Sequence, residues 1–369
     1  MYSAFSSAPN EPREPESQPP LERAGFKPIA LSLGVGAVGG AVFSALSVPL
    51  AWMLGPMIVN IVASVRGVPV LVPHSARAAT LCIVGVFLGG SFSPDLMSRL
   101  GEWALSLLMM VAFIPLITLI ASIYYQKLAG FDGLTAMFSG TPGTLTAMVI
   151  IGGESGADER MIALTQGLRV VIVVFLMPLV VVAVTAAGPL STNILPEGGP
   201  FLWRDGALLL AAALTGFGLA RVLKLPASAM TGSMLASAAL YLSGLVHWRP
   251  PDAALWVCLW VLGSAIGSRF STVPPRTFFK VSRHAVVATA VVILISAAFA
   301  LLVSQLTGMA YMTALLSFTP GGVAEMCLIA IAFDIDPATV AIHHLVRIVV
   351  LITAAPFAAL WLKARQIQI

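Results

Sequence analysis

The chain has 369 residues, of which 58% are hydrophobic and only 10% are charged. Because a soluble domain carries about 25% charged residues, this chain has too few polar side chains to cover a surface in water. Its net charge of +4 suits basic residues at membrane boundaries better than a nucleic-acid interface. The composition therefore predicts an integral membrane protein and excludes a water-soluble globular domain.

The N-terminal residues 1–26 differ from the rest of the chain. They are rich in Pro, Glu and Ser and contain no apolar core of their own, so they do not have the pattern of a signal peptide. We expect this segment to be a disordered tail.

Apolar stretches follow one another through the remainder of the chain. Runs of about 20 residues favour helices over the strands of a membrane barrel, which alternate over about 10 residues, so we expect an all-α polytopic membrane protein. Several stretches are shorter than a span requires, which suggests broken or tilted helices around a cavity. The stretches are Pro28–Leu46, Pro49–Val65, Ala78–Gly90, Trp103–Tyr125, Gly133–Gly152, Met161–Ala187, Ala207–Ala220, Ala227–Val246, Ala253–Gly267, Ala285–Leu306, Tyr311–Phe333 and Pro337–Leu362.

The chain repeats itself, with a first membrane repeat over residues 27–190 and a second over residues 205–369. The motif Ser-Gly-Thr-Pro-Gly at Ser139–Gly143 returns as Ser-Phe-Thr-Pro-Gly at Ser317–Gly321, 178 positions later. Matches between glycines alone would mean little, but one offset that also carries Pro, Asp and Arg indicates a tandem duplication. Further pairs at this offset are Asp158 and Asp336, Arg169 and Arg347, and Pro178 and Pro356.

The distribution of basic residues favours opposite orientations for the two repeats. Residues Arg269 to His284 form the most basic loop, which the positive-inside rule places in the cytoplasm, whereas the corresponding Ser91 to Glu102 has no positive excess. Inverted repeats need an odd number of crossings, and five result if Gly133–Gly152 and Tyr311–Phe333 each enter and leave on one side. If both stretches cross fully, each repeat has six crossings and the repeats are parallel.

Each Thr-Pro-Gly element lies inside an apolar stretch. Thr is a favoured N-cap and Pro is favoured at the first helical position, so both elements predict the start of a half-helix in mid-membrane. Two half-helices that meet near the midplane would present free N–H groups and positive dipole ends to a solute. The alternative is a proline kink in an ordinary span. The candidate substrate-binding residues here are Thr141, Pro142, Gly143, Thr144, Thr319, Pro320, Gly321 and Gly322.

Three charged residues lie deep within apolar stretches, namely Arg169, Arg347 and Glu325. Intramembrane charges cost at least about 2.5–3.5 kcal/mol each on insertion scales, so these side chains should face the protein interior. Arg can hold a carboxylate through two hydrogen bonds, which favours an organic anion and makes all three residues candidates for substrate binding. As alternatives, each Arg pairs with a carboxylate such as Glu325, binds carbonyl groups at a helix end, or extends to the headgroups.

Two adjacent histidines precede Arg347. His344 occupies the position of Gln166 in the first repeat and is a further candidate substrate-binding residue. Together with His343 it could relay protons, and a buried structural histidine is the alternative. The three cysteines lie singly in apolar stretches, so we predict no metal site, no cofactor and no catalytic residue.

The two S-x-T-P-G elements, each followed by an acidic turn and an intramembrane Arg, resemble the duplicated AbrB-type bacterial membrane proteins. The run PLAWMLGPM at Pro49–Met57 and its weaker echo PASAMTGSM at Pro226–Met234 are similar to the same family. The resemblance covers nearly everything after the tail and implies a membrane location and a duplicated fold. The family is labelled either ammonia monooxygenase or regulator of gene expression, and the resemblance implies no particular substrate.

We expect a secondary transporter, not an enzyme, that moves a small solute, an organic anion, across the bacterial inner membrane. Its partners would be the lipid bilayer, the solute and a coupling proton or cation, without direct nucleic-acid binding. A homo-oligomer is compatible with the sequence. The alternative is a membrane protein that affects gene expression indirectly or through a partner. Monooxygenase activity fits poorly, because copper or iron sites need several converging His or carboxylate ligands and the sequence shows no such spacing.

Overall fold

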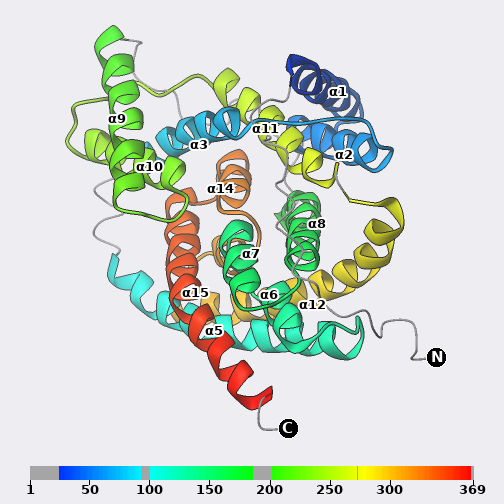
Figure 1. Cartoon of the computed structure of the whole chain (residues 1–369). Coiled ribbons are helices and arrows are strands. Elements are labelled where there is room, and N and C mark those ends of the chain that lie inside the picture. Colours follow the sequence, from blue (N-terminus) through cyan, green and yellow to red (C-terminus); the bar gives the residue numbers. More distant parts are fainter. Residues whose placement is uncertain (1–24, 93–99, 186–201, 272, 367–369) are drawn as a thin grey trace.

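The computed structural model describes residues 25–92, 100–185, 202–271 and 273–366. Within these ranges the chain forms helices and connecting loops without strands, which confirms the all-α class (Figure 1). Of the predicted tail, only Gly25 and Phe26 are described, so its predicted disorder lies outside the described residues.

The helices of the two repeats correspond one to one. Six helices of the second repeat begin 177 or 178 residues after their first-repeat counterparts. The first repeat contains α1 (Phe26–Ala45), α2 (Ala51–Val65), α3 (His74–Gly89), α5 (Leu100–Lys127), α6 (Gly133–Gly140), α7 (Leu145–Glu154) and α8 (Glu159–Thr185). The second contains α9 (Trp203–Val222), α10 (Ser228–Leu242), α11 (Asp252–Gly267), η2 (Ser268–Phe270), α12 (Pro275–Thr307), α13 (Tyr311–Phe318), α14 (Val323–Ala332) and α15 (Pro337–Gln366).

The loops between these helices repeat as closely as the helices do. Left-handed backbone conformations recur at matching positions of the two repeats, although glycine is replaced by Asp at one of them. Because such conformations are uncommon for residues other than glycine, their recurrence shows that the same turns were duplicated. The matching pairs are Ser47 and Lys224, Leu50 and Ala227, Gly67 and Gly244, Gly130 and Gly308, and Gly156 and Asp334.

Glycines let the first two helices of each repeat pack backbone to backbone. A Cβ atom on Gly39 of α1 or on Gly55 of α2 would collide with the backbone of the other glycine. Gly216 of α9 and Gly232 of α10 meet in the same way. Small residues of this kind are the usual means of close helix association in membranes, where lipid is as apolar as the side chains.

The repeats exchange contacts reciprocally. Helix α2 packs on α11 and α10 packs on α3, so each repeat places its second helix against the third helix of the other. Gly267 of α11 lies against Met57 of α2, and Gly89 of α3 lies against Ala238 of α10. A reciprocal exchange of equivalent elements is the mark of a two-fold relation.

The direction of equivalent helices shows that the two-fold relation inverts the repeats. Along α5 and α12, the tilted rings of Phe113 and Phe299 pack with their centroids 5.0 Å apart, and further along α5 the Tyr124 ring lies 6.2 Å from that of His284. The residue numbers rise on one helix as they fall on the other, so these equivalent helices are antiparallel. Both are long and apolar enough to cross a membrane, and an axis along the membrane normal would have left them parallel. The predicted inversion is therefore confirmed.

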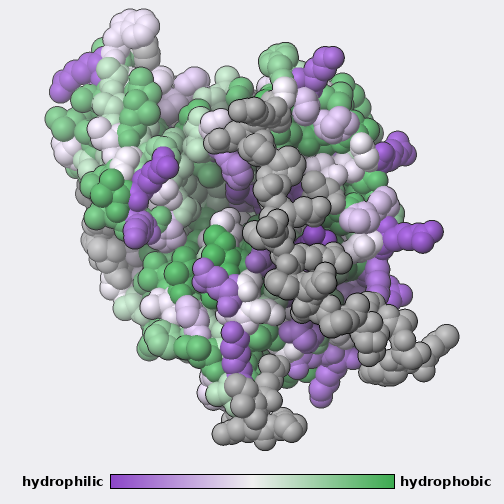
Figure 2. All heavy atoms as spheres, in the orientation of Figure 1, coloured by the Kyte–Doolittle hydropathy of each residue, from purple (hydrophilic) through white to green (hydrophobic). Residues whose placement is uncertain are grey.

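The helices form an upper and a lower region with further helices between them (Figure 1). In Figure 1, the first three helices of both repeats fill the upper part of the molecule, α5 and α12 lie along the lower part, and α6, α7 and α14 lie between them. Seven of the described helices could span a bilayer by length and composition, namely α1, α5, α8, α9, α11 continued by η2, α12 and α15. Figure 2 shows apolar side chains over much of the face formed by α9 and α10, with hydrophilic side chains in separate patches. These features confirm a multi-pass membrane protein.

One predicted segment was wrong in its bounds. The stretch taken as the loop Arg269 to His284 is mostly helical, because α12 begins at Pro275, which occupies a first-turn position where its missing N–H costs nothing. The predicted start of this apolar stretch, Ala285, lies later than the start of the helix because the first turns of α12 carry Arg276, Lys280 and Arg283. The predicted breaks at the two Thr-Pro-Gly elements are confirmed, because each of these stretches forms a pair of short helices.

The sidedness of the repeats can be tested with one matched pair of cysteines. Leu128 and Leu306 occupy equivalent positions and are 65% and 58% exposed. In a protein whose three native cysteines are replaced by Ala, we expect Leu128→Cys, beside Lys127, to react with an impermeant maleimide from the cytoplasmic side and Leu306→Cys from the opposite side. Labelling of intact cells and of everted vesicles measures this, and reaction of both from one side would contradict inverted repeats.

Candidate functional site

The chain turns back on itself at each Thr-Pro-Gly element. The Asp158 backbone N–H, just before α8, donates to the Thr135 hydroxyl at the start of α6, with 2.9 Å between N and Oγ1. The hairpin of α6 and α7 therefore begins and ends at one level, as the five-crossing hypothesis requires. In the second repeat, the equivalent Thr313 and Asp336 line one small cavity, so the hairpin of α13 and α14 also re-enters.

The Thr-Pro-Gly elements form the turns of these hairpins. Thr141 is extended, with φ −66° and ψ 127°, and the Gly143 N–H bonds back to the Thr141 carbonyl across Pro142 at 2.9 Å. Thr319 has the same conformation, and the Gly321 N–H closes the same turn at 2.9 Å. The residue before Pro is restricted to extended geometry, so each Thr ends the incoming helix.

The expectation that these Thr residues are N-caps was therefore wrong. Thr141 is the C-cap of α6, and its hydroxyl donates to the Met137 carbonyl at 2.7 Å. The outgoing half-helices begin three residues later, with Thr144 as the N-cap of α7 and Gly322 as the N-cap of α14. Sequence favours both roles for Thr before Pro, and in the folded chain each Thr continues an incoming helix, α6 packed on α5 and α13 packed on α12.

Arg169 holds the broken end of α6. Its Nη1 donates to the Thr141 carbonyl at 3.0 Å, and its Nη2 donates to Gln166 Oε1 at 2.6 Å. Gln166 in turn donates to the carbonyls of Phe138 and Thr141 at 2.7 and 2.8 Å. These carbonyls have lost their helical partners where the helix stops, and cationic donors also stabilise the negative end of the helix dipole.

Arg347 holds the broken end of α13 in the same way, with His344 in the place of Gln166. Its Nη1 and Nη2 donate to the carbonyls of Thr319 and Gly321, each at 3.2 Å, and Nη2 also donates to His344 Nδ1 at 2.7 Å. His344 Nε2 bonds to the Leu316 carbonyl at 2.9 Å. Because a carbonyl can only accept and Arg can only donate, His344 must carry its hydrogen on Nε2 and is a neutral imidazole.

The structure thus favours one of the alternatives for the intramembrane arginines. Both side chains are buried, at 6% and 2% exposure, and both bind carbonyls at a helix end. In the described part of the chain, neither guanidinium forms an ion pair with Glu325.

Both hairpin turns line a single cavity of about 900 Å³. The cavity reaches from the tips of the two hairpins to the starts of α3 and α8 and to η2. Its wall carries the four cationic residues Arg77, Arg160, Arg269 and Arg347 against the two acidic residues Glu159 and Glu325. This excess of positive charge, added to two helix N-termini, makes the cavity suited to an anion.

The two half-helices differ at the surface that they present to the cavity. Neither Thr144 nor Gly322 makes a side-chain capping hydrogen bond. In α14, however, Glu325 folds back over the N-terminus, and a Cβ atom on Gly322 would collide with its carboxylate. The corresponding residue of α7 is Ala147, so the N-terminus of α7 is open and that of α14 is covered by the chain's own anion.

The predicted site residues fall into two groups. Gly143, Thr144, Gly321, Gly322, Glu325 and Arg347 line the cavity, whereas Thr141, Pro142, Arg169, Thr319, Pro320 and His344 do not and form the turns or hold them. Sequence reasoning missed Arg77, Arg160 and Arg269, because cations beside helix ends read as juxtamembrane charges. Their position at the starts of α3 and α8 and at η2, next to short apolar segments, was the available signal.

The fold and this site define a duplicated, multi-pass membrane protein whose inverted repeats bring two re-entrant hairpins to one cavity. The family described as "AbrB: Transition state regulatory protein AbrB" matches residues 52–363. The chain belongs to this family, as its motifs had indicated.

Two bacterial relatives are similar over nearly their whole length. "Uncharacterized protein YhjN" of Bacillus subtilis (strain 168) is 27% identical over 351 residues, which cover 88% of this chain and 90% of the relative. "Putative regulator AbrB" of Escherichia coli (strain K12) is 26% identical over 333 residues, which cover 89% of this chain and 92% of the relative. The second name describes that protein as a regulator.

The hydrogen bonds of Arg347 predict that its replacement destabilises the protein and that a second replacement, of Glu325, does not restore the stability. Arg347→Gln removes charged donors from two buried carbonyls, and a hydrogen bond to a charged group contributes roughly 1.5–3 kcal/mol. We expect a clear fall in the thermal unfolding midpoint of the purified protein, no rescue by Arg347→Lys, and no recovery when Glu325→Gln is added. The exposed Arg66→Gln is the control, and recovery in the double variant would indicate a buried ion pair instead.

Proposed function

We propose that the protein is a secondary transporter of a small organic anion in the bacterial inner membrane, without enzymatic activity. One observation carries the proposal, namely that two inverted re-entrant hairpins turn at the wall of a common cavity of about 900 Å³. Inverted repeats with broken helices at a central site are a recurring architecture for alternating access, in which one repeat moves against the other around the solute.

The open N-terminus of α7 is the proposed position for the anionic group. The first amide of this helix with a helical acceptor is that of Met148, which bonds to the Thr144 carbonyl at 3.0 Å. The amides of Leu145, Thr146 and Ala147 precede it and are available to a bound carboxylate.

The rest of the cavity wall suggests an apolar body attached to this anionic group. Leu145, Val149, Val170, Val323 and Ile348 contribute apolar surface, and the volume is within the range of about 300–1,000 Å³ that holds small ligands. A carboxylate with a short aliphatic or aromatic body matches both features.

The names of the family and of one relative support a second candidate function, an effect on gene expression. A transporter would exert such an effect indirectly by changing the concentration of a metabolite, whereas a scaffold would need a protein partner. A scaffold without transport leaves the open N-terminus of α7 and the shared cavity without a role, so we rank it second.

The proposal is tested by measuring thermal stabilisation with a panel of aliphatic and aromatic monocarboxylates and dicarboxylates, amines and neutral amides. A ligand at 100 times its dissociation constant stabilises the folded state by about 2.7 kcal/mol. We expect carboxylates alone to raise the unfolding midpoint, and the same compounds in radiolabelled form to enter proteoliposomes. Stabilisation by amines alone, or binding without uptake, would overturn the proposal.

A change copied from the second repeat to the first tests where the anion binds. Ala147→Glu places a carboxylate at the position that Glu325 occupies in α14, so we expect it to cover the N-terminus of α7 and to abolish carboxylate binding. Ala147→Gln has the same size without the charge and should retain most of the affinity. Binding measured by thermal shift or calorimetry decides this, and equal loss in both variants would indicate a steric effect only.

A further inference from the structure

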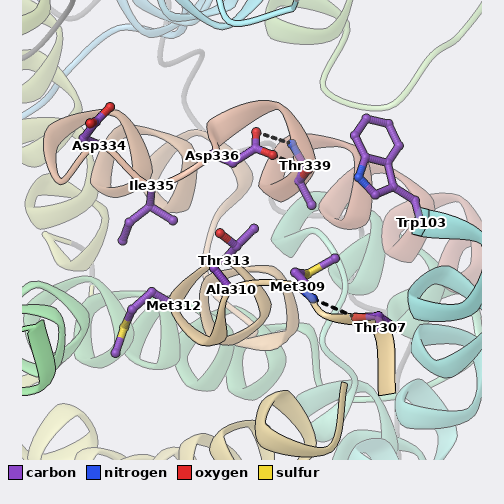
Figure 3. Close-up of a pocket in the computed structure, with 10 residues that line it drawn as sticks. All are labelled: Trp103, Thr307, Met309, Ala310, Met312, Thr313, Asp334, Ile335, Asp336 and Thr339. Atoms are coloured by element: carbon purple, nitrogen blue, oxygen red, sulfur yellow. Dashed lines mark hydrogen bonds between the residues drawn. The ribbon is translucent and has the colours of Figure 1, made fainter. Parts of the chain in front are cut away.

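A second cavity lies at the base of the hairpin formed by α13 and α14, away from the hairpin turns. It has a volume of about 290 Å³ and is bounded by the ends of four helices (Figure 3). Figure 3 shows Thr313 on α13 pointing into the space below Asp336 and Thr339, with Trp103 of α5 at its side. Asp334 and Ile335 complete the wall toward α14.

The equivalent polar groups of the first repeat are bonded to one another. There, Asp132 caps α6 through the amides of Leu134 and Thr135, and the Thr135 hydroxyl is taken by the Asp158 amide. In the second repeat the capping position is Ala310, which has no polar side chain. Thr313 is only 6% exposed, and its hydroxyl has no partner in the described part of the chain. A buried polar group without a partner, directed into a cavity, marks a place for water.

His343 lies directly behind this cavity. Its Nδ1 lies 2.8 Å from the carbonyl of Thr339, and its Nε2 lies 2.9 Å from Ser106 Oγ. Ser106 Oγ also lies 2.9 Å from the carbonyl of Trp103. Both Thr339 and Trp103 line the cavity, so the imidazole, which is fully buried, is separated from the cavity by a single layer of residues.

The partners of His343 accept either protonation state of the ring. The Thr339 carbonyl can only accept, so Nδ1 carries a hydrogen in both states. In the neutral ring, the Ser106 hydroxyl donates to Nε2. In the imidazolium, Nε2–H donates to Ser106 Oγ and the hydroxyl turns to donate to the Trp103 carbonyl. One hydroxyl rotation therefore accommodates the proton, whereas His344 is held neutral because Arg347 donates to its Nδ1.

The first repeat shows that the helix itself needs no histidine here. The equivalent residue is Thr165, whose hydroxyl donates to the Met161 carbonyl at 2.8 Å. That bond reproduces the one that His343 makes to Thr339, the counterpart of Met161. A titratable ring at this position in one repeat alone therefore adds a property that helix geometry does not require.

The groups around His343 come from four elements, and in the described part of the chain the charged and titratable ones lie on α15 and on the loop that precedes it. Asp334 and Asp336 border the cavity between α14 and α15, and Asp336 accepts from the Thr339 hydroxyl at 2.6 Å. On α15 itself, His344 follows directly and Arg347 lies one turn further along. From α13 the ring of Phe318 packs at 6.0 Å, and α5 contributes Ser106 and Trp103.

We propose that His343 is a proton-binding site filled from this cavity, and that its proton is the one coupled to transport. The coupling rests on the proposed function, whereas the proton site does not. A proton from cavity water binds Nε2, the Ser106 hydroxyl turns to the Trp103 carbonyl, and the ring gains one positive charge. This charge lies one turn from Arg347 and repels it, which weakens the hold of Arg347 on the Thr319 turn.

The proton site is tested by nitrogen NMR of histidine-labelled protein in nanodiscs. Two variants assign the signals, and each copies the first repeat: His343→Thr reproduces Thr165, and His344→Gln reproduces Gln166. We expect the His343 signal to change from neutral ring to imidazolium as the pH is lowered through and below the range where histidine ordinarily titrates, and the His344 signal to stay that of the Nε2–H tautomer. A flat His343 signal, or two signals that move together, would overturn the proposal.

Access through the cavity is tested in the same samples. Thr313→Cys, modified with a methanethiosulfonate that carries an ammonium group, should lower the titration midpoint of His343 by roughly half a unit or more, because a like charge disfavours protonation. Modification with the neutral methyl reagent controls for size. An unchanged midpoint with the charged reagent would show that His343 does not sense the cavity.

Coupling is tested separately, with whichever carboxylate enters proteoliposomes. We expect an imposed pH gradient to drive uptake in the parent protein and in His247→Gln, which changes an exposed histidine away from both cavities, but not in His343→Thr. If His343 titrates but the protein moves no carboxylate, the proton site stands and the proposed transport function is wrong. If uptake depends neither on the pH gradient nor on His343, only the proposed coupling is wrong.

Discussion

The arrangement of this protein depends on how it satisfies backbone carbonyls where two helices stop inside the molecule. Hydrocarbon offers no hydrogen bonds, so a broken helix is tolerated at membrane depth only where the protein supplies partners. Arg169 and Arg347 supply them, assisted by Gln166 and His344. The energetic penalty of burying each guanidinium is offset by the carbonyls that it binds, and the turns held in this way place the half-helix N-termini at the cavity.

Duplication gave the protein two copies of this device, and small differences between the copies separate their roles. Ala147 leaves the N-terminus of α7 open, whereas Glu325 covers that of α14. The Thr165 hydroxyl donates to a carbonyl of its own helix, whereas His343 at the same position also contacts Ser106 on α5. Symmetry thus provides the framework, and the asymmetric residues mark where solute and proton are proposed to bind.

The inverted relation gives these differences a direction. Because the antiparallel packing of α5 and α12 reverses one repeat relative to the other, the bases of the two hairpins face opposite sides. The large cavity extends to the start of α8 at the base of the first hairpin, and the small cavity lies at the base of the second. The two cavities therefore differ in volume, about 900 and 290 Å³, and lie at the bases of different hairpins.

Sequence alone determined the membrane class, the duplication, the breaks at the Thr-Pro-Gly elements and the burial of Arg169 and Arg347, because composition, periodicity and the restrictions of Pro act locally. It could not decide whether Thr141 ends one helix or begins the next, since both roles suit the residue, nor what the buried arginines bind. Those answers depend on residues far apart in the chain, such as Arg169 with Thr141 and His343 with Ser106. Only tertiary packing brings such partners within hydrogen-bond distance, and for that reason the tertiary structure decided which of the predicted residues face the cavity.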